Sequence, residues 1–485
     1  MNLRYIKEPL LEFGRGGRFE CPRQGIYNFA PYDIDKQVRP EKINVGIIGR
    51  SDSVDEVLDW LKNCRDKVVA PVQRQAKHPK LYPNFCGFNK DNGFYSELAF
   101  DETYTKKINN SDFDKIIKEY NNLEDRITEV ADLYLSHIKF LSKNKRPDVI
   151  ICVLPEKLVP LLNQQVDLKK DSEDILDDLQ DSLEDEGNSE REQNFRSLLK
   201  AKSMQYNVPI QIIRDRITKP SGEMQDPSTI AWNIFTALYY KASGIPWAMV
   251  KSSNIVCYAG IGFYKSRDRQ TTQTSVAQIF NELGKGVILR GGEVTIKRND
   301  RTPHLTESQA YEILDNALTE YKEAIGTIPP QRLVLHKTSN FNDAEIAGFE
   351  AAAINKHGVG ALDLVTINER SGIRLFREND YPVLRGTHLR LSKENHVLYT
   401  RGSVPFYETY TGQYIPNPIE IRLFRHDENP DIICDEILAL TKMNWNNTQF
   451  DRRLPITIEC ARNVGAILKY MNDSDPMQLK YSFYM

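Results

Sequence analysis

Short apolar runs alternate with amphipathic segments along the first half of this chain, and this alternation limits the fold more than any other feature. The apolar runs have the length of buried strands, and the segments between them have helical periodicity. The expected elements are strands at 43–49, 147–154 and 208–213, and helices at 53–64, 113–141, 194–205 and 227–242. Such alternation predicts an α/β fold, with a parallel sheet covered by helices.

A second α/β pattern begins at residue 254. The sequence Thr306-Glu-Ser-Gln309 is a capping box and predicts the start of a helix. The other expected elements are a hairpin around 263–272, strands near 286–290 and at 332–338, a helix near 343–356, a β-rich stretch over 361–425, and helices at 431–442 and 461–471. Residues 1–40 are rich in turn-forming sequence and are expected to form an arm without packed elements.

The composition is that of a globular protein, with 40% hydrophobic and 27% charged residues in a chain of 485. The seven cysteines and eight histidines form no Cys-x-x-Cys or His-x-x-x-His pair, which argues against a disulfide framework and a zinc enzyme. No apolar run reaches the length of a membrane span, and the start of the chain is unlike a signal peptide. A cytoplasmic protein without a membrane partner is therefore expected.

The net charge of −3 is unevenly distributed. Residues 167–192 carry twelve acidic and three basic side chains, a local charge of −9, so the rest of the chain carries +6. A positive remainder is compatible with a nucleic-acid partner. The acidic stretch is interpreted as a solvated insertion, and an acidic flap that competes with a phosphate backbone for a basic groove is the alternative.

Residues 194–241 carry the most specific binding signal. Arg196 and Lys200 are one helical turn apart and so share a face of a helix. Gln211 lies in the strand that follows, and Lys241 ends the next helix. Cations and an amide from separate elements make a suitable site for phosphate, which accepts several N–H donors. The alternative is a solvated helix face, with Gln211 pointing into solvent from an edge strand.

Three segments of the second half, 254–263, 332–338 and 454–464, are interpreted as strands. Their order and surroundings resemble the PIWI domain of Argonaute proteins, an RNase H-like fold. Cleaving members carry metal-binding acids at positions that correspond to Gly262, Thr338 and Arg462. Two-metal cleavage needs several carboxylates, so this resemblance implies a PIWI domain that binds nucleic acid without cutting it.

The binding signal in turn resembles the pocket of the Argonaute MID domain that holds the 5′-phosphate of a guide strand. Lys200, Gln211 and Lys241 match its Lys, Gln and second Lys, whereas Arg196 stands where many relatives have Tyr or His. In relatives the C-terminal carboxylate helps to hold a divalent cation. The resemblance therefore implies a Mg²⁺ ion that bridges the first guide phosphates, with the Met485 carboxylate and Gln211 as ligands, unless the C-terminus is a frayed tail.

The resemblance covers nearly the whole chain, which is identified as a short prokaryotic Argonaute. It implies an N-terminal arm over 1–40, a Rossmann-like MID domain over 41–250 with the insertion 167–192, and an RNase H-like PIWI domain over 251–485.

The implied activity is recognition and not catalysis. A small guide RNA would direct the chain to complementary single-stranded DNA of plasmids or phage. The bound target would then activate an APAZ-containing partner with a TIR, sirtuin-like or nuclease effector, commonly with loss of NAD and abortive infection. The chain is expected to form a heterodimer with that partner, with a higher oligomer possible on activation. Apolar residues of the arm, Leu10, Leu11, Tyr27 and Phe29, are candidates for the docking strip, although the arm could instead wrap around its own PIWI domain.

Two other interpretations stay open. An active nuclease could recruit unusual ligands from Glu293, Asp300 and Asp343. A doubly wound metabolic enzyme would need a Gly-rich turn between a strand and a helix, for which residues 48–53 are a poor match.

Overall fold

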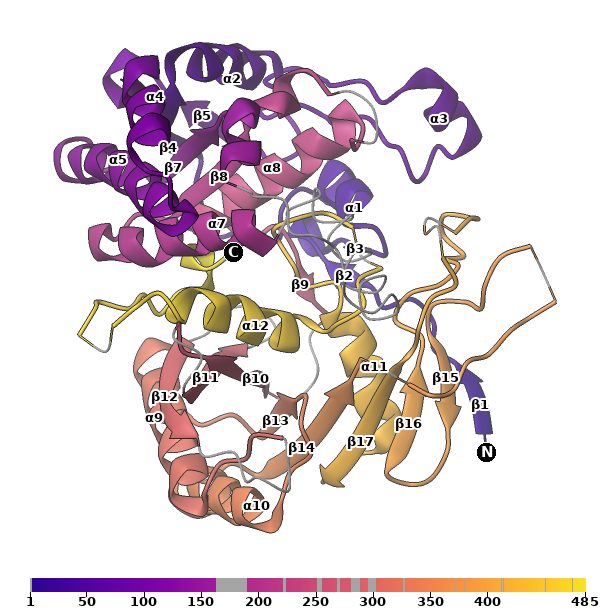
Figure 1. The fold of residues 1–485 in the computed structure, drawn as a ribbon. Coiled ribbons are helices and arrows are strands. Elements are labelled where there is room, and N and C mark those ends of the chain that lie inside the picture. Colours follow the sequence, from indigo (N-terminus) through magenta and orange to yellow (C-terminus); the bar gives the residue numbers. More distant parts are fainter. Residues whose placement is uncertain are drawn as a thin grey trace.

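Two large β-sheets organise the chain, one in each of the two lobes seen in Figure 1. A small three-stranded sheet lies beside them. The computed structural model describes residues 2–162, 190–220, 224–250, 255–267, 271–280, 288–294, 302–325, 328–369, 371–378, 380–410, 412, 414–449, 451–472 and 474–485. Within these ranges, no helix is long and apolar enough to cross a membrane.

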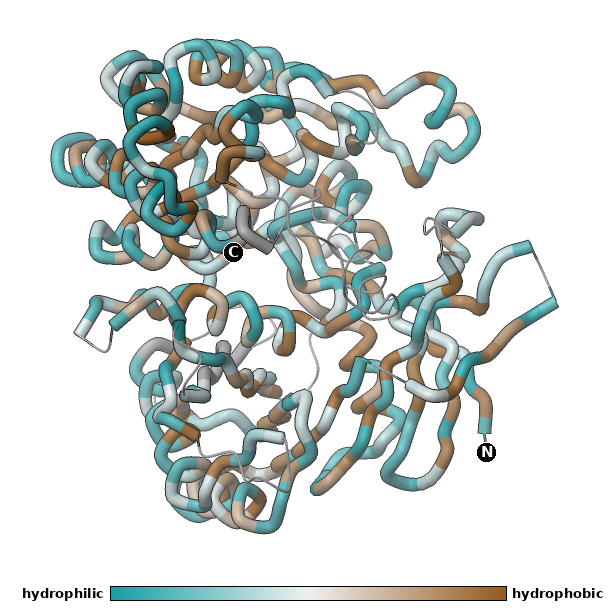
Figure 2. Tube along the Cα trace, in the orientation of Figure 1, coloured by the Kyte–Doolittle hydropathy of each residue, from teal (hydrophilic) through white to brown (hydrophobic). Residues whose placement is uncertain are grey.

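The first lobe contains the parallel sheet expected from the alternating pattern. Its strands pair in the order β5-β4-β7-β8, and β6 pairs with the far end of β4. The strands are β4 (Lys42–Arg50), β5 (Glu97–Ala99), β6 (Thr105–Ile108), β7 (Val149–Leu154) and β8 (Ile210–Arg214). Every residue of β7 is buried because helices cover both faces. Figure 2 shows the same contrast, with hydrophobic central strands and more hydrophilic outer helices.

Most helices of this lobe follow the sequence pattern, although α3 was not expected. They are α2 (Ser51–Asn63), α3 (Val72–Lys77), α4 (Asn110–Glu119), α5 (Leu123–Asn144), α7 (Glu190–Ser203) and α8 (Pro227–Lys241). The single helix expected over 113–141 is wrong, because α4 and α5 are separate. Asn122 begins α5 as its N-cap and accepts a hydrogen bond from the Glu124 amide at 3.0 Å. Most of the acidic stretch 167–192 lies outside the described residues.

The second lobe is built on a nine-stranded sheet with the order β1-β15-β16-β17-β14-β13-β10-β11-β12. The central strands β10, β13 and β14 are parallel, and the other pairs are antiparallel. The strands are β1 (Asn2–Tyr5), β10 (Val256–Lys265), β11 (Thr272–Phe280), β12 (Ile288–Val294), β13 (Arg332–Lys337), β14 (Ala361–Asn368), β15 (Thr387–Arg390), β16 (Asn395–Leu398) and β17 (Ile419–Arg425). The expected hairpin around 263–272 is the β10–β11 pair.

Alternate residues of β10 pack into different cores, as strand geometry requires. Cys257, Ala259 and Ile261 face helices α9 (Glu307–Ile325) and α10 (Asp343–Glu350). Val256 and Tyr258 belong to the core that contains α11 (Pro430–Leu440) and α12 (Ile456–Leu468). The capping box is confirmed, since the Gln309 amide donates to Thr306 Oγ1 at 3.2 Å and the Thr306 amide donates to Gln309 Oε1 at 3.0 Å.

The strand expected over 454–464 is wrong, because residues 456–464 belong to helix α12. Residues 456, 460, 464, 467 and 468 are all buried, and this spacing places them on one helical face. Figure 1 shows α12 between the nine-stranded sheet and the first lobe. The helix therefore covers the sheet on the side where the two lobes meet.

The arm over residues 1–40 is not an unpacked turn region, which corrects the expectation from its composition. It contains β1, β2 (Leu11–Glu12), β3 (Arg18–Phe19) and α1 (Pro22–Phe29). Strand β1 pairs with β15, and β2 pairs with β9 (Ala248–Met249). Leu11 is 0% exposed and Phe29 is half-buried, whereas Leu10 and Tyr27 are exposed. The arm thus wraps around its own chain, as the alternative interpretation had it.

Candidate functional site

The C-terminus lies between the lobes, next to α7 and α8 (Figure 1). Met485 is buried, so the frayed-tail alternative is wrong. The Lys241 ammonium donates to the backbone oxygens of Met485 at 2.6 Å and Ser482 at 3.1 Å. Lys200 Nζ lies 3.4 Å from the Tyr484 carbonyl oxygen. The structure therefore brings both predicted lysines to the chain terminus.

Electrostatics at this point favour an additional anion. Burial, and then the Lys200 ammonium, hold the pKa of Lys241 well below its usual value. The two lysine side chains thus lie close together in a poorly solvated place, beside the single carboxylate of the chain terminus. An anion with several acceptor oxygens would stabilise both lysines in their charged form.

The other two predicted pocket residues lie at the adjoining strand β8. Arg196 on α7 donates to the Ile212 carbonyl at 3.1 Å, so its guanidinium reaches the residue next to Gln211. Gln211 Oε1 is buried and has no hydrogen-bond partner within the described part of the chain. A buried amide oxygen without a partner is costly, and it marks this position as one that a ligand would complete. Its solvent-facing alternative is therefore not what the structure shows.

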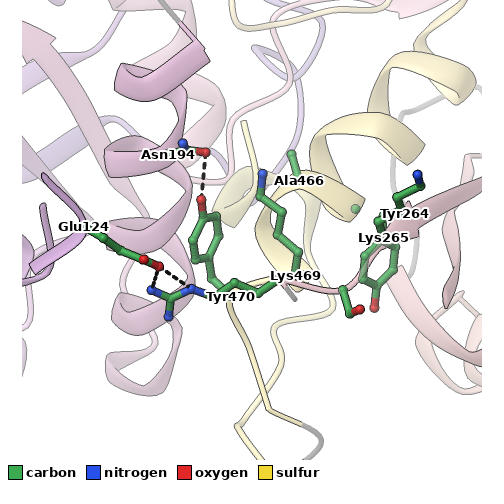
Figure 3. Close-up of a pocket in the computed structure, with 10 residues that line it drawn as sticks. Glu124, Asn194, Tyr264, Lys265, Ala466, Lys469 and Tyr470 are labelled. Carbon is green, nitrogen blue, oxygen red and sulfur yellow. Dashed lines mark hydrogen bonds and ion pairs between the residues drawn. The ribbon is translucent and has the colours of Figure 1, made fainter. Parts of the chain in front are cut away.

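A cavity of about 400 Å³ lies beside this region, between the two lobes (Figure 3). Tyr470 donates to Asn194 Oδ1 at 2.8 Å, and Arg267 Nε lies 3.0 Å from a Glu124 carboxylate oxygen. The residues that line the cavity are Glu124, Asn194, Tyr264, Lys265, Ser266, Arg267, Gly465, Ala466, Lys469 and Tyr470. Its basic and aromatic side chains are of the kind that contact the phosphates and stack on the bases of single-stranded nucleic acid. Sequence reasoning missed it, although Lys469-Tyr470 and the basic hairpin turn were visible signals.

The three degenerate nuclease positions gather at one end of the nine-stranded sheet. Ile261 pairs with Lys337 in the parallel register of β10 and β13. The next residues, Gly262 and Thr338, therefore lie side by side. Gly262 lies against helix α12, where an added Cβ would be 3.0 Å from the Ala461 Cβ. The next residue on that helix is Arg462, so helix α12, and not a third strand, carries the third position to this end of the sheet.

Arg462 forms an ion pair with Glu369, the residue directly after β14. Arg453 Nη1 lies 3.9 Å from the same carboxylate group. Sequence reasoning missed Glu369, since its position one residue beyond a strand end was the only local signal. The one acidic side chain identified beside the degenerate positions is therefore held by arginines, which leaves it poorly suited to bind a metal ion.

The buried carboxylate nearest in sequence to Thr338 is also occupied. Glu345 and Lys337 form a fully buried ion pair, with Lys337 Nζ 2.6 Å from each carboxylate oxygen. Glu345 also accepts hydrogen bonds from the backbone amides of Leu305 at 3.0 Å and Asn342 at 3.1 Å. These contacts fix the start of α10 and leave the carboxylate with no role in metal binding.

Two of the three acids considered for an atypical nuclease, Glu293 and Asp343, are described, and both are exposed. Glu293 is exposed on the edge strand β12, and Asp343 is exposed at the first position of α10. Asp300 lies outside the described residues. The described residues thus offer no cluster of carboxylates around Gly262.

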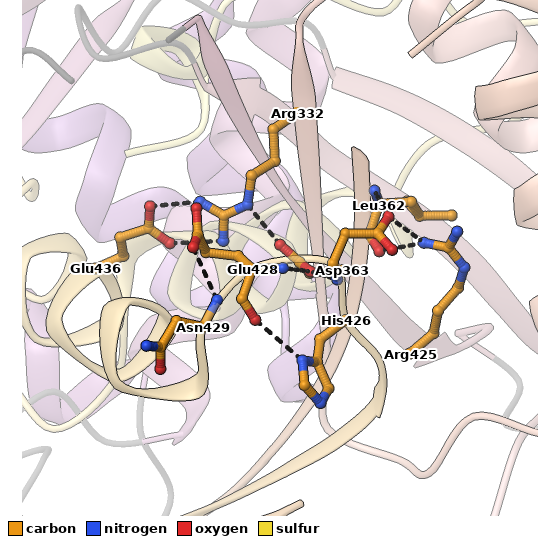
Figure 4. Close-up of polar contacts among 9 residues, drawn as sticks. Arg332, Leu362, Asp363, Arg425, His426, Glu428, Asn429 and Glu436 are labelled. Atoms are coloured by element: carbon orange, nitrogen blue, oxygen red, sulfur yellow. Dashed lines mark hydrogen bonds and ion pairs between the residues drawn. The ribbon is translucent and has the colours of Figure 1, made fainter. Parts of the chain in front are cut away.

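A buried ion network fixes the opposite end of the same strands (Figure 4). Arg332, at the start of β13, donates to Asp363 Oδ2 at 2.5 Å and to both oxygens of Glu436, at 2.6 and 2.9 Å. Asp363 also accepts from the Asp427 amide at 2.7 Å. The network joins β13, β14 and α11. It therefore fixes these strands at the end opposite to Gly262 and Thr338.

Comparison with known proteins identifies the family. The Piwi domain model matches residues 188–473. The protein argonaute of Aquifex aeolicus (strain VF5) is 22% identical over 281 residues, which are 56% of this chain and 35% of that protein. The Clostridium butyricum Argonaute, solved with a guide DNA and a 19-mer target DNA, superposes with a TM-score of 0.63 at 17% identity, over 100% of this chain and 55% of that one.

The Aquifex aeolicus Argonaute structure gives a TM-score of 0.57 at 16% identity, over 99% of this chain and 57% of that one. This chain spans little more than half the length of these solved chains and about a third of the curated relative. The predicted α/β fold class, with a Rossmann-like unit followed by an RNase H-like unit, is confirmed. The chain belongs to the Piwi domain family and is an Argonaute-type protein.

Proposed function

We propose that this chain holds a small guide RNA by its 5′-phosphate and uses it to recognise complementary single-stranded DNA, which it does not cut. The observation that carries the proposal is the convergence of Lys200 and Lys241 on the buried C-terminus. A phosphate at this place would receive charge-assisted hydrogen bonds from both lysines. Base pairing to the guide would supply the sequence specificity.

The four predicted contacts divide by chemistry. Lys200 and Lys241 supply positive charge, and Arg196 adds a guanidinium that is anchored on β8. The Gln211 amide oxygen, which is buried on β8, would contribute an acceptor. Under the proposal the cavity between the lobes then receives the following nucleotides, with Lys265 and Lys469 on its walls (Figure 3).

The donor set also fits a Mg²⁺ ion. The buried Gln211 oxygen has no partner among the described residues, and together with the Met485 carboxylate it would supply the oxygen ligands of the ion. Mg²⁺ prefers such hard oxygen donors together with substrate phosphates. When bound, the ion would neutralise charge between the first guide phosphates, while the two lysines keep the terminal carboxylate in place.

Absence of cleavage is proposed from the pairing of Arg462 with Glu369. The Arg462 guanidinium lies at this strand end, whereas a two-metal nuclease would need several carboxylates there. Guide-loaded protein is to be incubated with matched single-stranded DNA and Mg²⁺ or Mn²⁺. Intact target is expected, and discrete products at a fixed distance from the guide 5′ end would establish the alternative, an atypical nuclease.

Target recognition is proposed to activate an APAZ-containing effector partner encoded nearby, as a heterodimer. Strand β1 is the edge of the nine-stranded sheet, and its Leu3 and Tyr5 are 62% and 42% exposed, which suits a partner surface. Co-expression of the neighbouring gene product is expected to give a stable complex whose effector responds to guide-matched DNA. If no complex forms, or if the effector does not respond to guide-matched DNA, the proposed partner is wrong.

A further inference from the structure

A cluster of two histidines and one cysteine lies in the second lobe, away from the guide site and from the degenerate nuclease positions. His388 is on β15, His396 is on β16 and Cys434 is on α11. All three are buried, and one potential ligand atom from each lies within 4.8 Å of the others. The proposed function gives this cluster no role.

The strand register explains how the two imidazoles meet. Strands β15 and β16 pair antiparallel with Arg390 opposite His396, so His388 and His396 are diagonal neighbours on one face. Helix α11 packs against that face, and Asp431 and Cys434, three residues apart, share one side of it. The cluster thus joins three elements that are distant in sequence.

The two imidazoles are hydrogen-bonded to each other through the nitrogens that would face a metal ion. His388 Nε2 and His396 Nδ1 face one another at 2.9 Å. Of the two outer nitrogens, His396 Nε2 lies 3.2 Å from the Lys393 carbonyl oxygen, whereas His388 Nδ1 lies 4.0 Å from Asp431 Oδ1, beyond hydrogen-bond distance. Metal-bound histidines almost always direct the second nitrogen to a carbonyl or a carboxylate, as His396 does here.

One atom of the cluster is incompletely bonded. His388 is nearly fully buried, and its Nδ1 has no hydrogen-bond partner within the described ranges.

We propose that His388, His396 and Cys434 bind one Zn²⁺ ion, with Asp431 as the carboxylate that orients His388. Two imidazoles and a thiolate suit Zn²⁺ and are poor ligands for Mg²⁺ or Ca²⁺. The Asp431 side chain is 37% exposed, which gives an ion access from solvent on that side. The fourth coordination position is left for water that enters there.

No reaction is assigned to the proposed ion, which would act through the elements that it joins. It would tie β15 and β16 to α11 at the place where the N-terminal strand joins the sheet. Arg4 of β1 pairs with Asp435 and lies 3.4 Å from Asp431, so the strand is anchored to the same helix. Zinc binding would therefore stiffen the sheet edge formed by β1 and β15.

The test measures metal content and cobalt spectra on the full chain. Protein purified without chelators and with its metal content analysed is expected to hold about one zinc per chain. Cys434→Ser and His396→Gln are expected to lose it. Cys152→Ser and His357→Gln, buried residues outside the cluster, serve as controls that keep it.

Cobalt titration of the metal-stripped wild type gives an answer that does not depend on whether a variant folds. A thiolate-to-cobalt charge-transfer band and tetrahedral d–d bands are expected, and added Zn²⁺ should abolish both and raise the melting temperature. Wild-type protein that holds no zinc and shows no cobalt–thiolate band would overturn the site. Equal zinc content in Cys434→Ser and in the wild type would overturn it as well.

Discussion

Replacing Lys200 by alanine gives the sharpest test of the guide pocket. Lys200 is half-buried on α7, and its ammonium is 3.4 Å from the Tyr484 carbonyl, a long contact that holds it near the C-terminus. A hydrogen bond between a lysine and a phosphate contributes about 1.5–3 kcal/mol. Since about 1.4 kcal/mol corresponds to a tenfold change in Kd, Lys200→Ala is expected to weaken binding of a 5′-phosphorylated guide roughly 10- to 150-fold.

The assay compares 5′-phosphorylated and 5′-hydroxyl guide RNAs by fluorescence anisotropy at one fixed salt concentration, because phosphate contacts depend on ionic strength. The 5′-hydroxyl guide should be affected little, so the preference for phosphate should shrink by the same factor. Lys202→Ala is the matched control. It lies on the same helix but is two residues away, and its Nζ pairs with Asp132 at 2.6 Å. Equal losses for both guides, or equal losses in both variants, would refute the assignment of Lys200 to the 5′-phosphate.

Three stability predictions follow from the second lobe, each measured by thermal and denaturant unfolding. Gly262→Asp is expected to cost about 1–3 kcal/mol by overpacking against α12, without creating cleavage activity; a neutral effect would contradict the close approach of that helix. Arg332→Leu leaves the Asp363 and Glu436 carboxylates buried and unpaired and should cost about 3–5 kcal/mol, whereas a loss near zero would mean that the network is solvated. Burial lowers the pKa of His336 from 6.5 to about 3, so the folded state binds fewer protons than the unfolded state between these values, and stability should fall as pH falls from 6.5 toward 3. His336→Gln should flatten this dependence, and an unchanged slope would show that other groups cause it.

The sequence was sufficient to predict most elements of both lobes, because strand–helix alternation and helix caps are local signals. It failed at 454–464, where the run Ile456-Thr-Ile favours a strand by intrinsic preference. Tertiary packing decides otherwise, since a helix there buries one continuous face on the sheet. The arm was misjudged for a related reason. Its turn residues are local signals, whereas the pairing of β1 with β15 joins segments almost four hundred positions apart in the chain.

The candidate sites also differ in whether local sequence signals reveal them. Arg196, Lys200, Gln211 and Lys241 could be named because each stands at a recognisable place in a predicted element. The cluster of His388, His396 and Cys434 could not be predicted, because the spacing of these residues in the sequence matches no metal-binding motif. The diagonal pairing of β15 and β16 brings the two histidines together. Spacing motifs detect ligands that share one turn or helix, and they miss ligands that a sheet register brings together.

The charge at the degenerate nuclease end bears on the proposed recognition of DNA. A nuclease site that kept its carboxylates but had no metal ions would repel the phosphates of a target strand. Here Gly262 and Thr338 carry no charge, and the Glu369 carboxylate is paired with Arg462. The Arg462 guanidinium neutralises the Glu369 carboxylate, as bound metal cations neutralise the carboxylates of a two-metal site. Under the proposed function, loss of the acids and gain of Arg462 act together: they remove the chemistry of cleavage and leave a strand end beside which a DNA backbone can lie without bound metal.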